Sequence, residues 1–305
     1  MKIVILDSYT IRQEDLSWDG LSAYGELTVY DRTDDCDILS RIGDAEIVIT
    51  SKVLLSGAVL AACPNLKYIG LPATGYNNID MDAARKRNIA VTNIPAYSTD
   101  AVAQHAFALI LEISNRIGLH NASVAAGEWS ASKYFCYCKT PILLLAGKSI
   151  GIVGYGSIGR RVGEIARAFG MEVHAYSREP EAALAADILS LHCPLTEENR
   201  EFVNRDLISK MKDGAILINT ARGGLINEPD LAEALKSGKL LAAGLDVLST
   251  EPPSPDHPLI GLPNCFITPH NAWMPKEMRR IIIDTTISNL AVFLEGGRQN
   301  RVDLV

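Results

Sequence analysis

The stretch IGIVGYGSIGRRVGEIARAFG, residues 150–170, decides the fold, because an apolar run leads through a glycine-rich turn into a helical pattern. In the G-x-G-x-x-G spacing the first glycine makes a tight turn, the second lets the backbone approach a pyrophosphate, and the third lets helix and strand pack closely. The start of the helix adds N–H groups and a positive dipole end. The stretch predicts a dinucleotide site, the alternative being a turn of the same kind that binds nothing. The residues expected to bind are Gly154, Gly156, Ser157, Ile158 and Gly159.

The residues after the next strand pattern bear on which dinucleotide is bound. An Asp or Glu at the end of that strand would accept a hydrogen bond from the ribose 2′-hydroxyl. In MEVHAYSREPEA, residues 171–182, Ser177 and Arg178 stand at that place, and a hydroxyl with a guanidinium suits the 2′-phosphate of NADP. Glu179 could reach the ribose if the loop shifted by two residues, which would favour NAD. We therefore expect NAD(P), with NADP favoured over NAD.

The chain alternates short apolar runs with longer helical patterns, and it does so in two series. Strands that are apolar on both faces and separated by helices are typical of parallel sheets covered on two sides. We therefore expect an α/β fold with two doubly wound parallel-sheet domains. The expected strands lie at 2–7, 27–31, 45–50, 66–73 and 89–95 in the first series, and at 149–156, 171–177, 186–194, 214–223, 241–247 and 264–270 in the second.

Two long helical patterns indicate how the domains are connected. The first, residues 98–127, lies between the two series and predicts a connecting helix. The second, residues 275–297, follows the last strand of the second series. A chain that starts in one domain, builds the other and returns by a helix explains this order. We expect residues 1–97 and 279–305 to form one domain and residues 98–278 to form the other.

Composition excludes several classes of partner. The 305 residues, 48% of them hydrophobic, can fill two ordinary cores. The net charge of −7, without a basic run, disfavours nucleic acid. The N-terminus MKIVILDSYT does not resemble a signal peptide, and no apolar run reaches the roughly 18 residues of a membrane span. No Cys, His, Asp or Glu cluster has metal-ligand spacing. We expect a cytoplasmic protein without nucleic-acid, membrane or metal partners.

Three polar residues follow strand patterns of the second series, at the carboxyl edge where open α/β sheets bind ligands. They are Arg222 after AILINTA, Glu251 after GLDVLST and His270 at the end of CFITPH. A guanidinium can bind a carboxylate, an imidazole can donate a proton to a developing alkoxide, and a carboxylate can orient the imidazole. Taken singly, each could be an ordinary loop residue. Their shared position favours a dehydrogenase of 2-hydroxy or 2-oxo acids.

Several further motifs, in order along the chain, resemble the D-isomer-specific 2-hydroxyacid dehydrogenase family. The resemblance covers essentially the whole sequence. The matching stretches are LPATGYNNID, AVAQHAFALIL, LAGKSIGIVGYGSIG, LHCPLTEENR, MKDGAILINTARGGLINEPDLAEAL, AAGLDVLSTEPP and NCFITPHNAW. It implies a flavodoxin-like, discontinuous substrate domain and a Rossmann NAD(P)-binding domain that close over a cleft, in a chain that forms a homodimer.

The resemblance also implies roles for individual residues. Arg222 becomes the substrate anchor, His270 the acid/base catalyst and Glu251 its partner. The backbone of Ala73, Thr74 and Gly75, in the motif PATG, is implied to bind the substrate carboxylate. The residues implied on the cofactor side, in addition to the glycine turn, are His192, Pro194, Thr220, Ala221 and Asp246.

The substrate is suggested by GEWSASKYFCYCKTPILLLAGKSIG, residues 127–151, which is similar to the segment before the Rossmann domain in glycerate dehydrogenases and hydroxypyruvate reductases. We expect reduction of hydroxypyruvate or glyoxylate to the D-2-hydroxy acid. Two alternatives stay open. One is a dehydrogenase of the same family for another small 2-hydroxy acid, and the other is a dinucleotide-sensing, corepressor-like binding protein.

One interval departs from the family pattern. Relatives have a helix between the Ser177–Arg178 position and the next strand, where this chain has only EPEAALA, residues 179–185. A parallel crossover normally needs about ten residues or more. Either the helix is lost or residues are missing between Arg178 and Ala185. We favour missing residues, because a right-handed crossover is hard to build in so short a piece.

Overall fold

The computed structural model describes residues 1–304 and divides into two compact units. The first unit comprises residues 1–98 and the segment from Met274 onward, and the second comprises residues 99–273. The chain thus leaves the first unit after Ser98 and returns to it at Met274. Both units are α/β structures built on parallel sheets, so the expected fold class is confirmed.

The first unit has five parallel strands in the order β2-β1-β3-β4-β5, which is the flavodoxin order. Every residue of β3, β4 and β5 is buried, as expected for central strands with both faces covered. The strands are β1 (Lys2–Ile5), β2 (Glu26–Val29), β3 (Ile47–Ile49), β4 (Tyr68–Gly70) and β5 (Ala90–Thr92).

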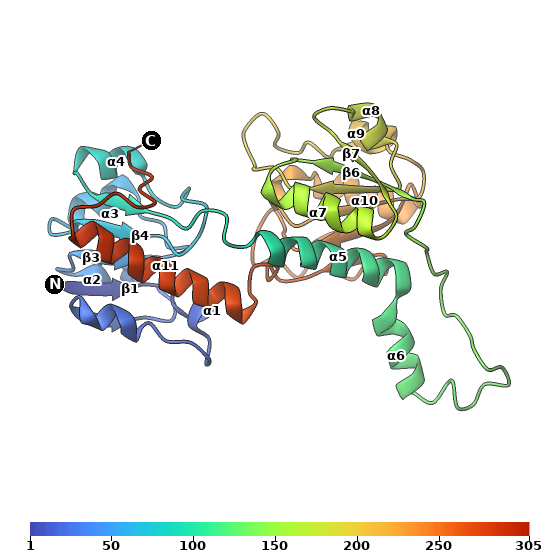
Figure 1. Cartoon of the computed structure of the whole chain (residues 1–305), viewed down its shortest axis with the longest axis horizontal. Coiled ribbons are helices and arrows are strands. Elements are labelled where there is room, and N and C mark those ends of the chain that lie inside the picture. The colour runs from blue at the N-terminus through green and yellow to red at the C-terminus, as the bar shows by residue number, and fades with distance from the viewer. Residues whose placement is uncertain (305) are drawn as a thin grey trace. The chain divides into compact units, whose positions relative to one another are not determined.

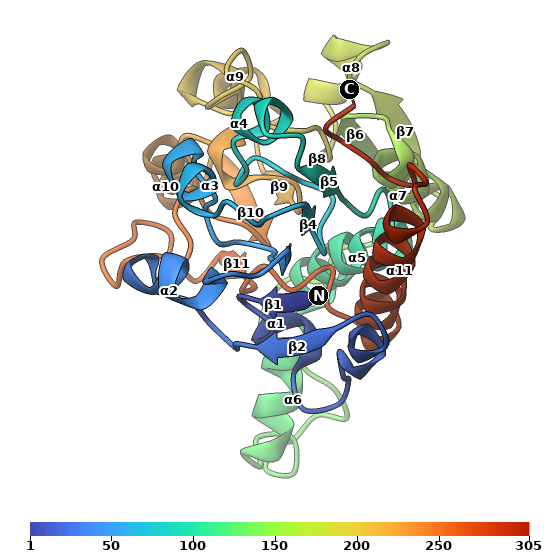
Figure 2. The ribbon, with the colours of Figure 1, turned by 90° about the vertical axis from the view of Figure 1, so that its left-hand side faces the viewer.

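The helices of the first unit lie on both sides of this sheet. Helices α2 (Ile38–Ile42), α3 (Gly57–Ala62) and α4 (Met81–Lys86) lie on one side of the strands, and α11 (Lys276–Leu294) lies on the other (Figure 2). The remaining elements are the short helices α1 (Tyr9–Arg12), η1 (Asp19–Ala23) and η2 (Asp35–Asp37).

A buried arginine joins the returning helix α11 to the N-terminal part of the first unit. Arg279 is only 5% exposed, and its guanidinium donates to both carboxylate oxygens of Asp15 at 2.6 and 2.9 Å. Its Nη1 also donates to the carbonyl oxygen of Ile11. The guanidinium holds the pKa of Asp15 down at about 2. The returning helix is therefore fixed by a paired charge as well as by apolar packing.

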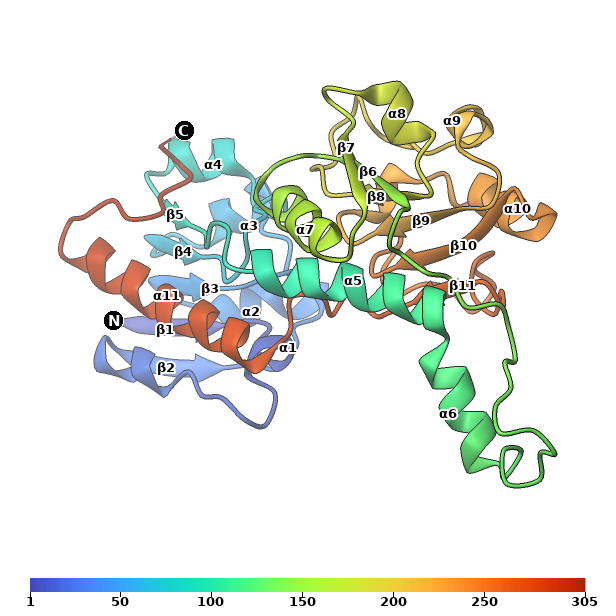
Figure 3. The ribbon, with the colours of Figure 1, turned by 45° about the vertical axis from the view of Figure 1, so that its right-hand side comes forward.

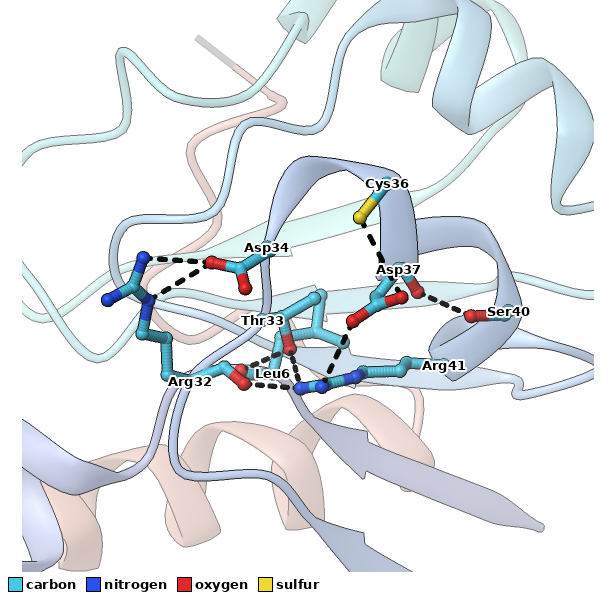
Figure 4. Close-up of polar contacts among 8 residues, drawn as sticks. All are labelled: Leu6, Arg32, Thr33, Asp34, Cys36, Asp37, Ser40 and Arg41. Atoms are coloured by element: carbon cyan, nitrogen blue, oxygen red, sulfur yellow. Dashed lines mark hydrogen bonds and ion pairs between the residues drawn. The ribbon is translucent and has the colours of Figure 1, made fainter.

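A polar cluster closes the segment between β2 and α2 (Figure 4). The guanidinium of Arg41, in α2, lies 4.4 Å from the ring centre of Tyr30. It also donates to the carbonyl oxygen of Arg32 and, at 3.0 Å, to Thr33 Oγ1. The buried Thr33 hydroxyl donates to the carbonyl oxygen of Leu6 at 2.6 Å. The cluster holds this segment against the carboxyl end of β1.

The second unit has six parallel strands in the order β11-β10-β9-β8-β6-β7. Alternate residues of one strand enter different cores, since Leu217 packs in one apolar cluster while Ile216 and Ile218 pack in the other. The strands are β6 (Ser149–Val153), β7 (Glu172–Ala175), β8 (Ile188–Leu191), β9 (Ala215–Asn219), β10 (Leu240–Leu245) and β11 (Cys265–Ile267). The helices are α5 (Thr99–Asn115), α6 (Ile117–Ala125), α7 (Ser157–Ala168), α8 (Pro180–Leu184), α9 (Arg205–Lys210), α10 (Glu228–Ser237) and η3 (Gly223–Leu225).

The short interval between β7 and β8 forms a crossover in this sequence, although the length rule makes so short a connection improbable. Both strands pair in parallel with β6, and the five-residue helix α8 connects them. The connection can be this short because α8 lies directly on β6. A Cβ added at Gly151 would fall 2.1 Å from the carbonyl oxygen of Ala183, so the missing side chain at Gly151 leaves room for the helix backbone.

A projecting arm, residues 117–144, follows the long helix α5. Arg116 separates α5 from α6 with a left-handed φ of +52°, and α6 with the segment after it extends away from the sheet of the second unit (Figures 1 and 3). Among residues 1–304, no helix is long and apolar enough to cross a membrane.

Candidate active site

The glycine turn at the end of β6 leaves open space beside the start of α7. Gly154 has a φ of +91°, and a Cβ on it would lie 2.4 Å from the backbone nitrogen of Cys193. A Cβ on Gly159 would lie 2.1 Å from the carbonyl oxygen of Gly154. No atom lies within 4 Å of a Cβ built on Gly156, which is the N-cap of α7.

This geometry fits a dinucleotide. Gly154 and Gly159 are needed for the close approach of turn, strand and helix, whereas Gly156 leaves room in front of the helix N-terminus. The first N–H groups of an α-helix have no partner within the helix, and here they belong to Ser157, Ile158 and Gly159. These groups would hold the diphosphate of NAD(P).

Buried polar atoms without partners follow the carboxyl ends of several strands of the same sheet. Within residues 1–304, His192 Nδ1, Thr220 Oγ1 and Asn271 Oδ1 are buried and make no hydrogen bond. His192 Nε2 pairs with Ser190 Oγ at 2.8 Å, and burial lowers the pKa of His192 to about 4, so the ring is neutral near pH 7. Buried polar groups are normally satisfied, and a bound carboxamide or ribose would supply the missing partners.

Two other residues are expected on the cofactor side, and their own contacts do not indicate a ligand. Pro194, two residues after His192, is exposed, and its carbonyl oxygen accepts from Asn199 Nδ2 at 2.8 Å. Ala221 is half-buried, and its N–H donates to Asn219 Oδ1 at 2.9 Å. Both follow strand ends of the second unit, as expected from the sequence.

Asp246 fixes the loop that carries His270. Its carboxylate is 1% exposed and accepts the Asn271 and Ala272 N–H groups at 3.0 and 2.9 Å. It also accepts the hydroxyl of Thr268 at 2.6 Å. The loop on either side of His270 is thus tied to the end of β10.

His270 and Glu251 form a direct pair. The distance from His270 Nδ1 to Glu251 Oε2 is 2.6 Å, and the two side chains are 29% and 36% exposed. His270 has a left-handed φ of +53°, a conformation uncommon outside glycine that here aims a side chain from a tight loop. Glu251 Oε1 accepts the N–H of Leu248 at 3.0 Å. If Nδ1 carries the proton toward the carboxylate, Nε2 is the nitrogen left to meet a ligand.

Arg222 follows β9 in a turn shaped by a buried asparagine. Asn219, fully buried, donates to the carbonyl oxygen of Arg222 at 2.9 Å through Nδ2. The Arg222 side chain is exposed, and its Nη1 donates to the Ala221 carbonyl oxygen at 2.7 Å. Sequence reasoning missed Asn219, although a polar residue at the end of the apolar run AILIN was a signal for it.

The expected substrate loop, residues 73–75, belongs to the first unit and is held by its own contacts there. Thr74 Oγ1 donates to the carbonyl oxygen of Ile94 at 2.8 Å, and the Thr74 carbonyl oxygen accepts from Asn93 Nδ2 at 2.8 Å. The Ala73 carbonyl oxygen accepts the Ile94 N–H. These contacts use the hydroxyl and the carbonyl groups of the loop, and they leave its N–H groups available.

The residues expected near the adenosine ribose differ in the polar contacts that their side chains make. Ser177, Arg178 and Glu179 are all exposed. Glu179 Oε2 contacts His174 Nδ1, on β7, at 2.8 Å. The side chain of Arg178 makes no polar contact with any part of the chain that the structure describes. Among residues 1–304, no group of three or more His, Cys, Asp or Glu side chains is placed to hold a metal ion.

Comparison with known proteins assigns the chain to a family. Residues 107–272 match the NAD binding domain of D-isomer specific 2-hydroxyacid dehydrogenases. The chain belongs to this family. Its sequence is 46% identical to a hydroxypyruvate reductase of Blautia hydrogenotrophica, over 99% of the chain and 100% of the relative. It is 38% identical to a glycerate dehydrogenase of Methylorubrum extorquens, over 88% of each chain.

A solved structure supports the same family assignment. The crystal structure of the TT0316 protein from Thermus thermophilus superimposes with a TM-score of 0.87 at 34% identity, covering 99% of this chain and 100% of that one. The resemblance seen in the sequence is therefore confirmed. The protein is an NAD(P)-dependent oxidoreductase of the D-2-hydroxyacid dehydrogenase family, which favours the enzymatic interpretation over a dinucleotide-sensing binding protein.

The glycine turn of this dehydrogenase yields a test that separates cofactor binding from folding. Gly156→Val should fold normally, because its Cβ meets no protein atom, and should weaken NAD(P)H binding by about a hundredfold by filling the space in front of the helix N-terminus. Fluorescence titration with NADPH and NADH measures the affinity, and circular dichroism checks the fold. Gly154→Ala is the matched variant that should instead destabilise the fold. Unchanged affinity in Gly156→Val would contradict the placement of the diphosphate.

Proposed function

We propose that the protein reduces hydroxypyruvate or glyoxylate to the D-2-hydroxy acid, with NADPH as the preferred cofactor. The observation that carries the proposal is the 2.6 Å contact between His270 and Glu251 at the carboxyl ends of the strands. A paired imidazole at the sheet edge that also carries the glycine turn is suited to transfer a proton to a substrate oxygen. The relatives named hydroxypyruvate reductase and glycerate dehydrogenase support this substrate class.

The proposed mechanism divides the work among three side chains. Glu251 holds the Nδ1–H of His270, and His270 donates a proton from Nε2 to the carbonyl oxygen of the keto acid. The guanidinium of Arg222 binds the carboxylate of the substrate and polarises its carbonyl. The bound cofactor supplies the hydride that reduces the keto carbon. Hydride and proton together convert the keto group into the hydroxyl group.

The first unit carries backbone donors that are suited to a carboxylate. We propose that the N–H groups of Ala73, Thr74 and Gly75 bind the substrate carboxylate. None of these three N–H groups has a hydrogen-bond partner within residues 1–304, while the carbonyl and hydroxyl groups around them are engaged. On the cofactor side, we propose that Thr220, Ala221 and Asp246 lie around the nicotinamide.

The proposed preference for NADPH is supported by the surroundings of Arg178 and Glu179. Glu179 is the carboxylate beside the end of β7 that could accept the ribose hydroxyls, and it contacts His174 at 2.8 Å. Arg178 is exposed and makes no polar side-chain contact within the described residues. An uncommitted guanidinium beside Ser177 supports binding of the 2′-phosphate.

Steady-state kinetics test the assignment of His270. Initial rates should be higher with hydroxypyruvate and glyoxylate than with pyruvate. His270→Gln should lower kcat by about a hundredfold to ten-thousandfold, because it removes the acid that protonates the substrate oxygen. Binding of NADPH, measured by fluorescence, should stay unchanged and serves as the control for folding. Full turnover of the variant with hydroxypyruvate would overturn the assignment.

Cofactor preference is tested at Arg178. Arg178→Ala should raise KM for NADPH by about tenfold to hundredfold, the worth of a charge-assisted hydrogen bond, with little effect on KM for NADH. Arg205→Ala, which removes an exposed guanidinium on α9, should change neither constant. An equal loss with both cofactors would mean that Arg178 does not bind the 2′-phosphate.

We also propose that the enzyme is a homodimer joined through the arm. Large apolar side chains along it are exposed, including Trp129 at 51%, Tyr134 at 77%, Phe135 at 90% and Leu144 at 75%. Apolar patches of this kind mark protein contacts, and a second copy of the chain would bring an identical apolar surface, as a two-fold dimer contact requires.

Sedimentation measures this directly. The wild-type enzyme should sediment as a dimer, and Phe135→Asp combined with Leu144→Asp should give a monomer, because two charges would be buried in the contact. Ile260→Asp places a charge on an exposed apolar residue outside the arm and should leave the dimer intact. A wild-type monomer at micromolar concentration would contradict the proposal.

A further inference from the structure

A buried carboxylate outside the proposed catalytic set lies at the start of α10. Glu228 is 8% exposed, and a buried carboxylate is costly unless its oxygens are hydrogen-bonded. Its Oε1 accepts the N–H of Ser249 at 2.7 Å. Its Oε2 accepts the hydroxyl of Ser249 and lies 3.0 Å from His257 Nε2. The side chains of Glu228 and His257 are 9% and 8% exposed.

The contacts of Glu228 end on the segment that carries Glu251. Ser249 lies between the end of β10 and Glu251. The adjacent N–H group, that of Leu248, donates to Glu251 Oε1 at 3.0 Å, and Glu251 Oε2 contacts His270. The carboxylates of Glu228 and Glu251 therefore accept neighbouring backbone N–H groups. Glu228 is buried within the second unit, whereas Glu251 contacts His270.

The same segment lies against the turn that carries Arg222. A Cβ added at Gly223 would fall 1.9 Å from the carbonyl carbon of Leu248 and 2.3 Å from the nitrogen of Ser249. Gly223 follows Arg222 directly, and Glu228 comes five residues later, after the N-cap Asn227. The Arg222 turn and α10 thus form one local segment, and Glu228 connects it to the Glu251 loop.

We propose that Glu228, Ser249 and His257 form a positioning set. They hold Glu251 against His270, and they keep the turn that carries Arg222 in a fixed position relative to that pair. The proposal rests on the proposed roles of those three residues. Stability alone does not account for the set, because well-packed apolar residues often replace a buried polar pair without loss. A hydrogen-bonded carboxylate also fixes the position of the loop, because it can accept both donors of Ser249 only when the loop lies in one place.

The first experiment compares two variants on the same helix. Glu228→Gln keeps the volume but removes the charge that accepts from Ser249 and His257. It should lower kcat with hydroxypyruvate by about tenfold to hundredfold, the effect of a catalytic group displaced by about 1 Å. KM for NADPH should stay unchanged, because the glycine turn is separate. Glu233→Gln, an exposed member of an ion pair with Lys236, should leave both constants unchanged.

A double-mutant cycle separates positioning from a general structural role. If Glu228 acts through Glu251, then Glu228→Gln should cost little in an enzyme that already carries Glu251→Gln. Losses that multiply in full in the double variant would overturn the proposal, because they would mean that none of the effect passes through Glu251. A full kcat in Glu228→Gln would also overturn it. A wild-type enzyme inactive on every keto acid would instead contradict the proposed function.

A milder variant keeps the proposal testable if Glu228→Gln does not fold. Ser249→Ala removes only the hydroxyl donor to Glu228 and leaves the backbone N–H contact. It should lower kcat in the same direction by a smaller factor, with KM for NADPH unchanged. The same cycle with Glu251→Gln applies. A loss that is independent of Glu251 would count against positioning.

Discussion

Loops at the carboxyl ends of parallel strands carry backbone N–H groups that no neighbouring strand can satisfy, and in this protein carboxylates accept them. Asp246 accepts two N–H groups of the His270 loop, Glu228 accepts that of Ser249, and Glu251 accepts that of Leu248. Leaving such a donor buried and unpaired costs about 1–3 kcal/mol. The positions of the loops that carry Glu251 and His270 are therefore set by directed hydrogen bonds, which apolar packing alone does not provide.

The first unit uses the same solution at its own sheet. Asp7, just after β1, accepts the N–H groups of Ser51 and Lys52 and the hydroxyl of Ser51. Burial raises the pKa of Asp7, while these donors act in the opposite direction. The contacts tie the segment after β3 to the segment after β1. A carboxylate at a strand end is thus a structural device in this fold, and it serves chemistry only where the loop it holds carries a reactive side chain.

Much of the site follows from local pattern. The glycine spacing and the strand-end rule are enough to find the turn at Gly154 and the group of Arg222, Glu251 and His270. Long-range contacts are different, because nothing in GLINEPD indicates that Glu228 is buried against a loop 21 residues later. The short helix of the crossover after β7 could not be predicted for a related reason. The length rule assumes a helix standing off the sheet, and it does not apply where Gly151 lets the helix backbone lie on the strand.

The short crossover and the proposed cofactor preference have a common physical origin. With α8 beginning at Pro180, Glu179 must turn back directly at the end of β7, where His174 is the base within reach. The carboxylate of Glu179 is thereby drawn to the strand, and the exposed guanidinium of Arg178 lies next to it along the chain, which is the arrangement on which the proposed preference rests.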